Sequence, residues 1–246
     1  MSRGTASSVS YTVHPLDNPI WQALTSSQAH LARTAKLARR FPNDVTSLGG
    51  FPAPSQDAYN SLAAILDDVN ATGLLFDSPQ EPPVGWMVLA GAPLLQMIHE
   101  NGKTTGSAAS ESIAREAAEL TAADAPEMLA LAQLTKPGPF GLRTRELGTY
   151  LGLRRESRLV AMVGERLRVP GFTEISAVCT QPDYLGRGYA AALMITLMER
   201  IHGRDEVPFL HVREDNTRAI ALYERLGFRK RVLLHFAVVR KPIASH

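Results

Sequence analysis

The feature that most constrains the fold of this chain is a change of hydrophobic period between residues 172 and 201. Residues 172–180 have the pattern of a strand, whereas the apolar residues after Tyr189 recur about every 3.6 positions. One helical face carries Ala190, Leu193, Met194, Leu197 and Ile201. Gly186 and Gly188 stand in the turn between the two segments. A strand that enters an amphipathic helix through a glycine turn predicts a sheet with helices packed against it.

The rest of the second half alternates between the same two patterns. Further strands are expected at 115–120, 148–153, 158–167, 209–213 and 232–239. Helices are expected at 123–134, from Tyr189 to Gly203, and from the capping residue Asn216 to Gly227. The order strand, helix, three strands, helix, strand, helix, strand predicts an α/β fold with a mixed sheet.

The first half of the chain has a weaker pattern. Helices are expected at 19–35 and 57–69, and short strands at 74–76 and 86–89. Residues 99–111 are small and polar with little apolar periodicity, which is typical of a linker between domains. We therefore expect an N-terminal domain over residues 1–110 and a second domain over residues 111–246.

Composition excludes several classes of protein. Of the 246 residues, 45% are hydrophobic and 20% are charged, the balance of a globular protein, and the net charge of +2 gives no footprint for nucleic acid. Cys179 is the only cysteine, so no disulfide can form within the chain. No signal-peptide pattern opens the sequence, and its most apolar window, 86–98, is too short to span a membrane. These features favour a cytoplasmic enzyme that binds neither nucleic acid nor membrane.

The glycine turn has the chemistry of an anion site. Gly186 and Gly188 let the backbone turn tightly and expose N–H groups, and the following helix adds its own unpaired N–H groups. Such a nest suits a diphosphate, although an ordinary strand-to-helix turn would use the same residues. A dinucleotide-binding turn is excluded, because Ala191 stands where that motif needs its third glycine.

Two longer motifs occur together in the second half. The first is Val178-Cys-Thr-x-Pro-x-x-x-Gly-x-Gly-x-Ala. The second is His211-Val-Arg-x-x-Asn216-x-x-Ala219-x-x-x-Tyr223-x-x-x-Gly227-Phe228. In order and spacing they resemble the motifs of the GNAT superfamily of acetyl-CoA-dependent N-acetyltransferases. The resemblance covers about residues 113–240, and it implies a GNAT fold with acetyl-CoA as co-substrate.

The resemblance assigns binding roles. The backbone of Val178, Cys179 and Thr180 would pair with the pantetheine arm of acetyl-CoA as an added strand would. The remaining cofactor-binding residues, most of them around the diphosphate, would be Leu185, Gly186, Arg187, Gly188, Tyr189, Ala190, Ala191 and Asn216. The chain departs from the family at Leu185, where glutamine or arginine is usual, but this position contributes its backbone as much as its side chain. A buried strand cysteine is the favoured interpretation of Cys179 over a covalent acyl carrier.

The resemblance also indicates catalytic groups. Acetyl transfer needs a deprotonated amine and a proton for the leaving thiolate. Tyr223 matches the general acid of the family, although a core tyrosine would also fit this helix. Glu174 is the first candidate for the base, and Glu165 on the adjacent strand could equally orient the substrate ammonium. Each could also be a solvated carboxylate, and many members of the family use a water chain instead. Loop 136–141 matches the acceptor-binding segment.

We therefore expect an N-acetyltransferase that moves the acetyl group to a primary amine by direct attack. The acceptor stays open between a small molecule and a peptide, and so does assembly as a homodimer. No metal is expected, because His202, His211 and His235 lack the spacing of metal ligands and fit structural or surface roles. The alternatives are a non-catalytic acetyl-CoA sensor and an aminoacyl-tRNA-dependent transferase. Residues 1–110 are expected to be a degenerate, cofactor-free GNAT-like half, with an unrelated helical cap as the alternative.

Overall fold

A mixed sheet of eight strands forms the centre of the molecule. The computed structural model describes residues 14–66, 71–100 and 108–242. The strand order is β4-β11-β5-β10-β9-β8-β7-β6, and β9 and β10 are the only parallel neighbours in it. The strands are β4 (Ala71–Phe76), β5 (Met87–Ile98), β6 (Ala118–Glu119), β7 (Tyr150–Arg155), β8 (Arg158–Val169), β9 (Phe172–Thr180), β10 (Val207–Arg213) and β11 (Arg229–Arg240). The expected α/β fold with a mixed sheet is confirmed.

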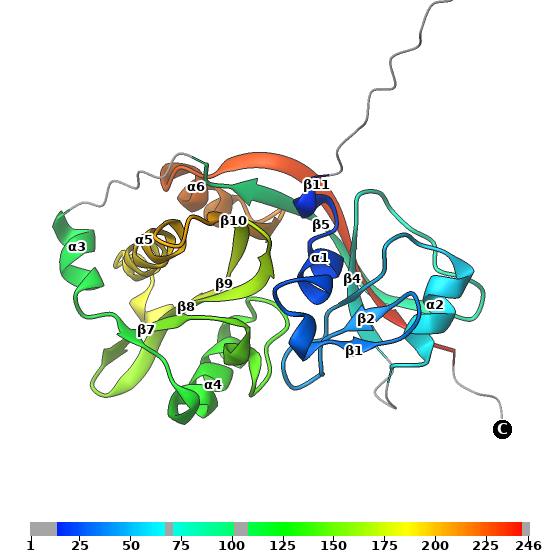
Figure 1. The fold of residues 1–246 in the computed structure, drawn as a ribbon. Coiled ribbons are helices and arrows are strands. Elements are labelled where there is room, and N and C mark those ends of the chain that lie inside the picture. Colours follow the sequence, from blue (N-terminus) through cyan, green and yellow to red (C-terminus); the bar gives the residue numbers. More distant parts are fainter. Residues whose placement is uncertain (1–13, 67–70, 101–107, 243–246) are drawn as a thin grey trace, which may run out of the picture.

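Helices cover both faces of this sheet (Figure 1). On one face lie α5 (Tyr189–His202), α6 (Thr217–Arg225) and α3 (Ala108–Ala114). On the other lies α4 (Ala125–Thr135). The alternation of side chains along β7 separates the two cores, because Leu151 and Leu153 pack under α5 while Tyr150 packs under α4. We call these the α5 face and the α4 face.

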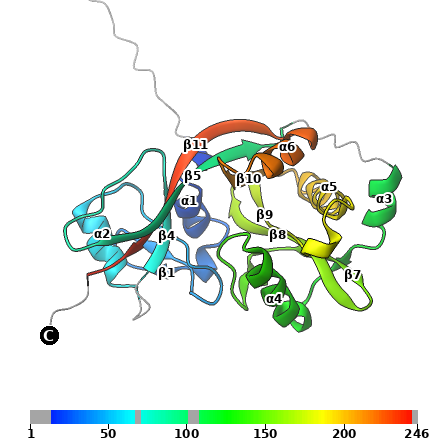
Figure 2. The same cartoon turned by 180° about the vertical axis from the view of Figure 1, so that it is seen from behind.

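The first half of the chain adds short elements and two strands of the main sheet. Its helices are α1 (Pro19–Thr25) and α2 (Gln56–Ala63), and β1 (Arg33–Thr34), β2 (Arg39–Arg40) and β3 (Gly49–Gly50) form a small sheet. β5 lies between β10 and β11, and Figures 1 and 2 show β5 and β11 running together from α6 toward α2. The main sheet thus crosses residue 110, and the division of the chain into two domains there stays a prediction.

Several expected elements differ from the observed ones. The strand expected at 115–120 is the two-residue β6, preceded by α3. The strand expected at 86–89 continues through Gly91 and Pro93 to Ile98, because β10 and β11 pair with it along most of its length. The helix expected at 19–35 ends at Thr25. Beyond it the amide of Gln28 binds the carbonyls of Leu147 and Arg166, a long-range interaction that local propensity does not predict.

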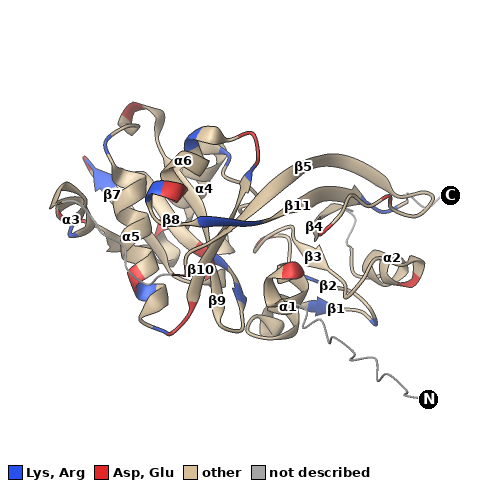
Figure 3. Ribbon diagram, turned by 90° about the horizontal axis from the view of Figure 1, so that it is seen from above, with Lys and Arg blue, Asp and Glu red and all other residues tan. Residues whose placement is uncertain are grey.

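The second expected helix of the first half, 57–69, is observed as Gln56–Ala63, and its last residues lie outside the described ranges. The same is true of 101–107 in the expected linker. Figure 3 shows basic and acidic positions interspersed over the ribbon, with one short basic stretch at the start of β11. Within the described ranges, no helix combines the length and the apolar character that a membrane span requires.

Candidate active site

The main sheet opens between its two parallel strands. β9 and β10 pair only from Phe172–Val207 to Glu174–Phe209. Beyond this point β10 stays paired with β5, and β9 stays paired with β8. The facing edges of residues 175–180 and 210–213 therefore separate. Their backbone N–H and C=O groups are available to an extended ligand that binds between them as an added strand would. Val178, Cys179 and Thr180 lie in this stretch of β9, and their pairing with a pantetheine arm stays a prediction.

An irregularity in β9 shapes the edge. Ala177 has a φ of 51°, uncommon for a residue with a side chain, and the β8–β9 register shifts between the Met162–Cys179 and Gly164–Ser176 pairs. The bulge turns Ala177 into the α4-face core, while Val178 packs against the α5-face core. Cys179 is buried, and burial raises the pKa of its thiol to about 11. Such a thiol is a poor nucleophile at neutral pH, which does not favour an acyl carrier.

The glycine turn lies at the end of β9 and leads into α5. Gly186 and Gly188 both have a φ of 78°, and Gly188 is the N-cap of the helix. A Cβ on Gly186 would meet no atom within 4 Å, and one on Gly188 would meet only Ile113 at 3.8 Å. The space in front of the helix N-terminus is therefore open to a ligand. Its unpaired N–H groups and the exposed Arg187 suit a diphosphate.

A cavity of about 380 Å³ lies at the opening between β9 and β10. From the α5 face it is lined by Ile175, Leu210, Val212 and Tyr223. From the α4 face it is lined by Arg166, His211 and Arg213, and by the loop residues Lys136, Pro137, Gly138 and Pro139. Because residues of both faces line one cavity, it reaches through the sheet. Residues 136–139 of loop 136–141 thus border the cavity, and the acceptor-binding role of this loop stays a prediction.

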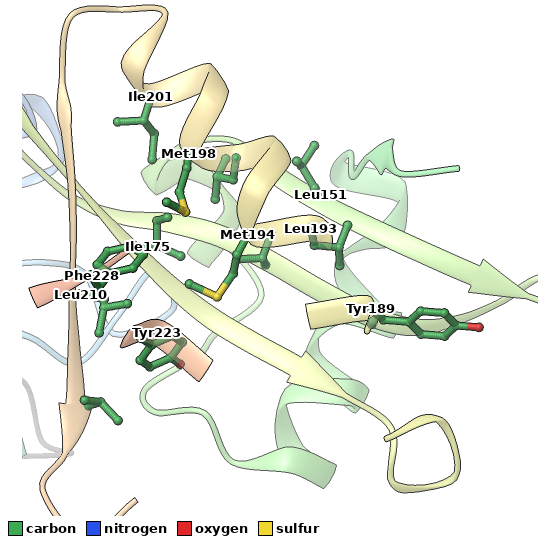
Figure 4. Close-up of a cluster of buried hydrophobic side chains, with 14 of the residues drawn as sticks. Leu151, Ile175, Tyr189, Leu193, Met194, Met198, Ile201, Leu210, Tyr223 and Phe228 are labelled. Atoms are coloured by element: carbon green, nitrogen blue, oxygen red, sulfur yellow. The ribbon is translucent and has the colours of Figure 1, made fainter. Parts of the chain in front are cut away.

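Tyr223 is on the α5 side of this opening, where α6 presents it to the core. Figure 4 shows its ring in the same cluster as Leu210 and Phe228. Its side chain is 8% exposed, and burial raises the pKa of its hydroxyl to about 12. The hydroxyl is therefore protonated at neutral pH and can donate a hydrogen. Asn216 also lines the cavity, and its side chain accepts from the Ala219 N–H at 3.1 Å, which caps α6.

Glu174 is buried on the α4 face and does not line the cavity. The Arg166 guanidinium donates to both of its carboxylate oxygens, at 2.9 and 2.6 Å, and His211 Nδ1 lies 2.7 Å from Oε1. Burial opposes ionisation of this carboxyl, but the charge and hydrogen bonds of Arg166, together with the hydrogen bond from His211, outweigh it and lower the pKa to about 2. Direct acceptance of an amine proton by Glu174 does not fit this position, because the side chain has no exposed surface.

His211 is among the residues that line the cavity and contacts Glu174, a position the sequence did not indicate, and its side chain is 2% exposed. Its Nε2 lies 3.0 Å from the amide nitrogen of Gln96. That nitrogen also donates to the Leu16 carbonyl, and the Gln96 oxygen accepts from Arg231, so the orientation of the amide is determined. Gln96 therefore donates to Nε2, and His211 carries its hydrogen on Nδ1, toward Glu174. The alternation of side chains along β10 could have indicated this position: Leu210 and Val212 face the α5-face core, so His211 between them faces the α4 side.

Glu165 lies away from the opening. Its Oε1 accepts from Arg204 at 2.9 Å and its Oε2 accepts from the Thr149 N–H at 3.3 Å. It does not line the cavity, so the expected role in orienting an ammonium does not fit its position. His202 contacts His99, with 3.0 Å between ring nitrogens. In the described part of the chain, no three or more His, Cys, Asp or Glu residues gather in a way that suits a metal ion.

Comparison with known proteins identifies the family. Residues 150–237 match the family described as FR47-like protein. N-alpha-acetyltransferase RimI of Mycobacterium tuberculosis is 38% identical over 122 residues, which are 45% of this chain and 76% of that protein. A putative acetyltransferase from the GNAT family of Novosphingobium aromaticivorans is 36% identical, and its crystal structure superposes with a TM-score of 0.84 over 94% of this chain and 100% of that one. The chain belongs to the GNAT family of N-acetyltransferases.

This GNAT chain is thus an acyltransferase, and enzymes of the family take acetyl-CoA as co-substrate. Mycothiol acetyltransferase of Brachybacterium faecium is 41% identical over 80 residues, but these are 30% of this chain and 24% of that protein. The match to the Novosphingobium GNAT structure covers most of the first half as well as the second. The solved relative therefore resembles this chain over both halves.

Proposed function

We propose that the chain transfers the acetyl group of acetyl-CoA to a primary amine by direct attack inside the opening between β9 and β10. The observation that carries this proposal is the cavity that reaches through the sheet. Acetyl-CoA would approach from the α5 face, where the glycine turn and Tyr223 lie, and the amine from the α4 face. The thioester and the amine would then enter the cavity from opposite faces of the sheet and meet inside it.

Acetyl-CoA binding would rest chiefly on backbone groups. The pantetheine arm would pair with the free edge of β9 at Val178, Cys179 and Thr180, because β10 has moved away from that edge. The diphosphate would lie on the turn and on the first N–H groups of α5, at residues 185–191. Arg187 would add one positive charge there. Asn216 would contribute indirectly, by starting the helix that carries Tyr223.

Tyr223 would protonate the leaving thiolate. Its position beside the opening supports this role, because a hydroxyl that is protonated at neutral pH can donate to a sulfur anion that forms next to it. The alternative role of Tyr223, as a core side chain alone, is compatible with its place in the hydrophobic cluster. The two roles differ in their consequence for turnover when the hydroxyl is removed.

The amine proton would pass to His211, with Glu174 as the carboxylate behind it. Only Nε2 can accept, because Nδ1 already faces Glu174. Nε2 accepts from Gln96 in this structure and the His211 side chain is only 2% exposed, so the Gln96 contact has to open before the amine, or a water next to it, can reach Nε2. A negative Glu174 at 2.7 Å would then stabilise the imidazolium that forms. Glu174 thus keeps a part in the proton transfer, but through His211.

A turnover screen tests the proposal. The chain is incubated with acetyl-CoA and a mixed panel of primary amines, and released thiol is measured together with acetyl-CoA consumption. We expect amine-dependent thiol release, with the acetyl group recovered on the amine nitrogen by mass spectrometry. Acetyl-CoA binding without release on the whole panel would contradict the proposed transfer.

A further inference from the structure

The part of the cavity on the α4 face has an apolar wall that comes largely from the first half of the chain. The wall consists of Ile20, Leu48, Leu75, Ala92, Leu94 and Phe236. Strand register explains how distant residues share this surface. Leu75 of β4 and Ala92 of β5 are both paired with Phe236 of β11, and Leu94 is paired with Arg213 of β10. Paired residues point to the same face, and Ala92, Leu94 and Gln96 alternate along β5 on that face, so neighbouring rows of side chains form one surface between His211 and β4.

The wall is partly covered and partly open. Ile20 and Leu48 are buried, and Leu75 and Phe236 pack against their cluster while keeping some surface exposed. Gly73 makes room for the aromatic ring, because a Cβ there would lie 2.7 Å from Phe236. The exposed remainder faces the cavity. A ligand that reaches His211 from this side therefore lies against apolar surface.

The charged side chains that line the cavity are all basic. None of its lining residues is Asp or Glu, whereas Lys136, Arg166 and Arg213 are all present. The buried Glu174 contacts His211, and both of its carboxylate oxygens accept hydrogen bonds from Arg166. Arg213 is paired with Asp215 at 2.6 Å, outside the lining. A ligand with a second ammonium group would thus place that charge against apolar or positive lining inside this cavity, since Asp17 and Asp77 line a separate pocket that shares Leu75 with it.

We propose that the acceptor is a monoamine with an apolar body, one without a second positive charge. This inference rests on the proposed function, and it makes the wall from residues 20, 48, 75, 92 and 94 the specificity surface of the enzyme. The reacting nitrogen lies near His211, and the carbon skeleton lies along Leu94, Ala92 and Leu75. Acceptors with several amino groups, such as polyamines, are poor substrates.

A matched pair of amines tests the inference. Hexylamine and 1,5-diaminopentane have the same number of heavy atoms and differ by one methyl group replaced with an amino group. With saturating acetyl-CoA, we expect kcat/KM for hexylamine to exceed that for 1,5-diaminopentane by at least about tenfold. Equal values, a preference for the diamine, or reaction with neither amine would overturn the proposal. This comparison uses the wild-type chain and does not depend on any variant folding.

A substitution in the wall sharpens the test. Ala92→Asp places a carboxylate on the wall without removing a large side chain, and it should lower the hexylamine preference at least about tenfold. Ala90→Asp is the matched control, because Ala90 is exposed two residues earlier on the same strand and does not line the cavity. The control should keep the wild-type ratio. The same ratio in Ala92→Asp as in the wild type would contradict the position of the acceptor.

The donor must be varied separately, because an apolar wall could also receive a longer acyl chain. If hexanoyl-CoA reacts faster than acetyl-CoA and Ala92→Asp changes this donor preference while leaving the amine ratio unchanged, the wall serves the acyl group and the proposal is wrong. If neither test amine reacts but others of the mixed panel do, the acceptor class is wrong and the proposed transfer stands. If no amine reacts at all, the proposed function itself has failed.

Discussion

The two faces of the sheet contribute different kinds of groups to the candidate site, which comprises the cavity and the glycine turn at the end of β9. On the α5 face the contributions are largely backbone: the free edge of β9, the turn at Gly186 and Gly188, and the N-terminus of α5. On the α4 face they are side chains, namely Arg166 and His211, which both contact the buried Glu174, and an apolar wall largely from the first half. Backbone groups suit a co-substrate that is always the same, whereas side chains suit an acceptor that differs between enzymes.

The largest effect is expected from a negative charge in the glycine turn. Gly188→Glu places a side chain and a carboxylate where the diphosphate would lie, and acetyl-CoA binding measured by calorimetry should be lost. Gly171→Glu is the control, since Gly171 has the same φ of 78° with open space around it, in the turn between β8 and β9. It imposes the same backbone strain and should bind normally. Normal affinity of Gly188→Glu would remove the turn from the site.

Removal of the Tyr223 hydroxyl should have the next largest effect. Tyr223→Phe keeps the ring in its cluster, so acetyl-CoA affinity and stability should change little. Turnover should fall by roughly 10²–10⁴-fold, the range typical of a general acid. Single-turnover thiol release measures the chemical step directly. Unchanged turnover would leave Tyr223 as a core residue and nothing more.

Substitution of His211 should have a smaller effect that depends on pH. His211→Gln retains an N–H donor toward Glu174 but lacks an imidazole nitrogen that could take the proton. Turnover at neutral pH should fall by about 10²-fold. It should recover in part at higher pH, because free amine then forms without help from the enzyme. His235→Gln on β11, outside the cavity lining, should follow the wild-type pH profile. Parallel profiles of His211→Gln and wild type would exclude His211 as the acceptor of the proton.

The smallest effect concerns stability in acid. The folded-state pKa of Glu174, about 2, lies below the usual 4.5, so its charge stabilises the folded protein above the usual value and loses this contribution as the pH falls toward 2. Glu174→Gln should be less stable than wild type at pH 7, because Arg166 then lacks its carboxylate. The difference in the free energy of unfolding should shrink between about pH 5 and pH 3. A constant difference in urea unfolding would contradict the direction of this shift.

The same division between the faces explains what could be predicted from the sequence. The bounds of β9 and the start of α5 at Tyr189 were predicted to the residue, and Asn216 and Gly227 bracket α6 as expected. These features depend on local patterns: alternation, helical period, capping and positive φ. The turn at Gly186 and Gly188 belongs to this group, and so the α5 face was largely predictable.

The α4 face depends on contacts between residues far apart in the sequence. Gln96 contacts His211, and Phe236 is paired with both Leu75 and Ala92, but no local pattern indicates that β5 enters the sheet between β10 and β11. Glu174 was selected for its spacing from Gly188, which places it on the correct strand. Spacing does not report burial, however, and the partner Arg166 comes from a different strand.

A crystal structure of the chain with bound CoA is the most direct test of the central claim, that the co-substrate enters from the α5 face and reaches the acceptor side through the opening between β9 and β10. The account predicts the diphosphate on residues 185–191, the pantetheine arm along Val178–Thr180, and the thiol sulfur in the opening, within hydrogen-bonding reach of the Tyr223 hydroxyl. CoA bound on the α4 face, or with its thiol directed away from the opening, would contradict it.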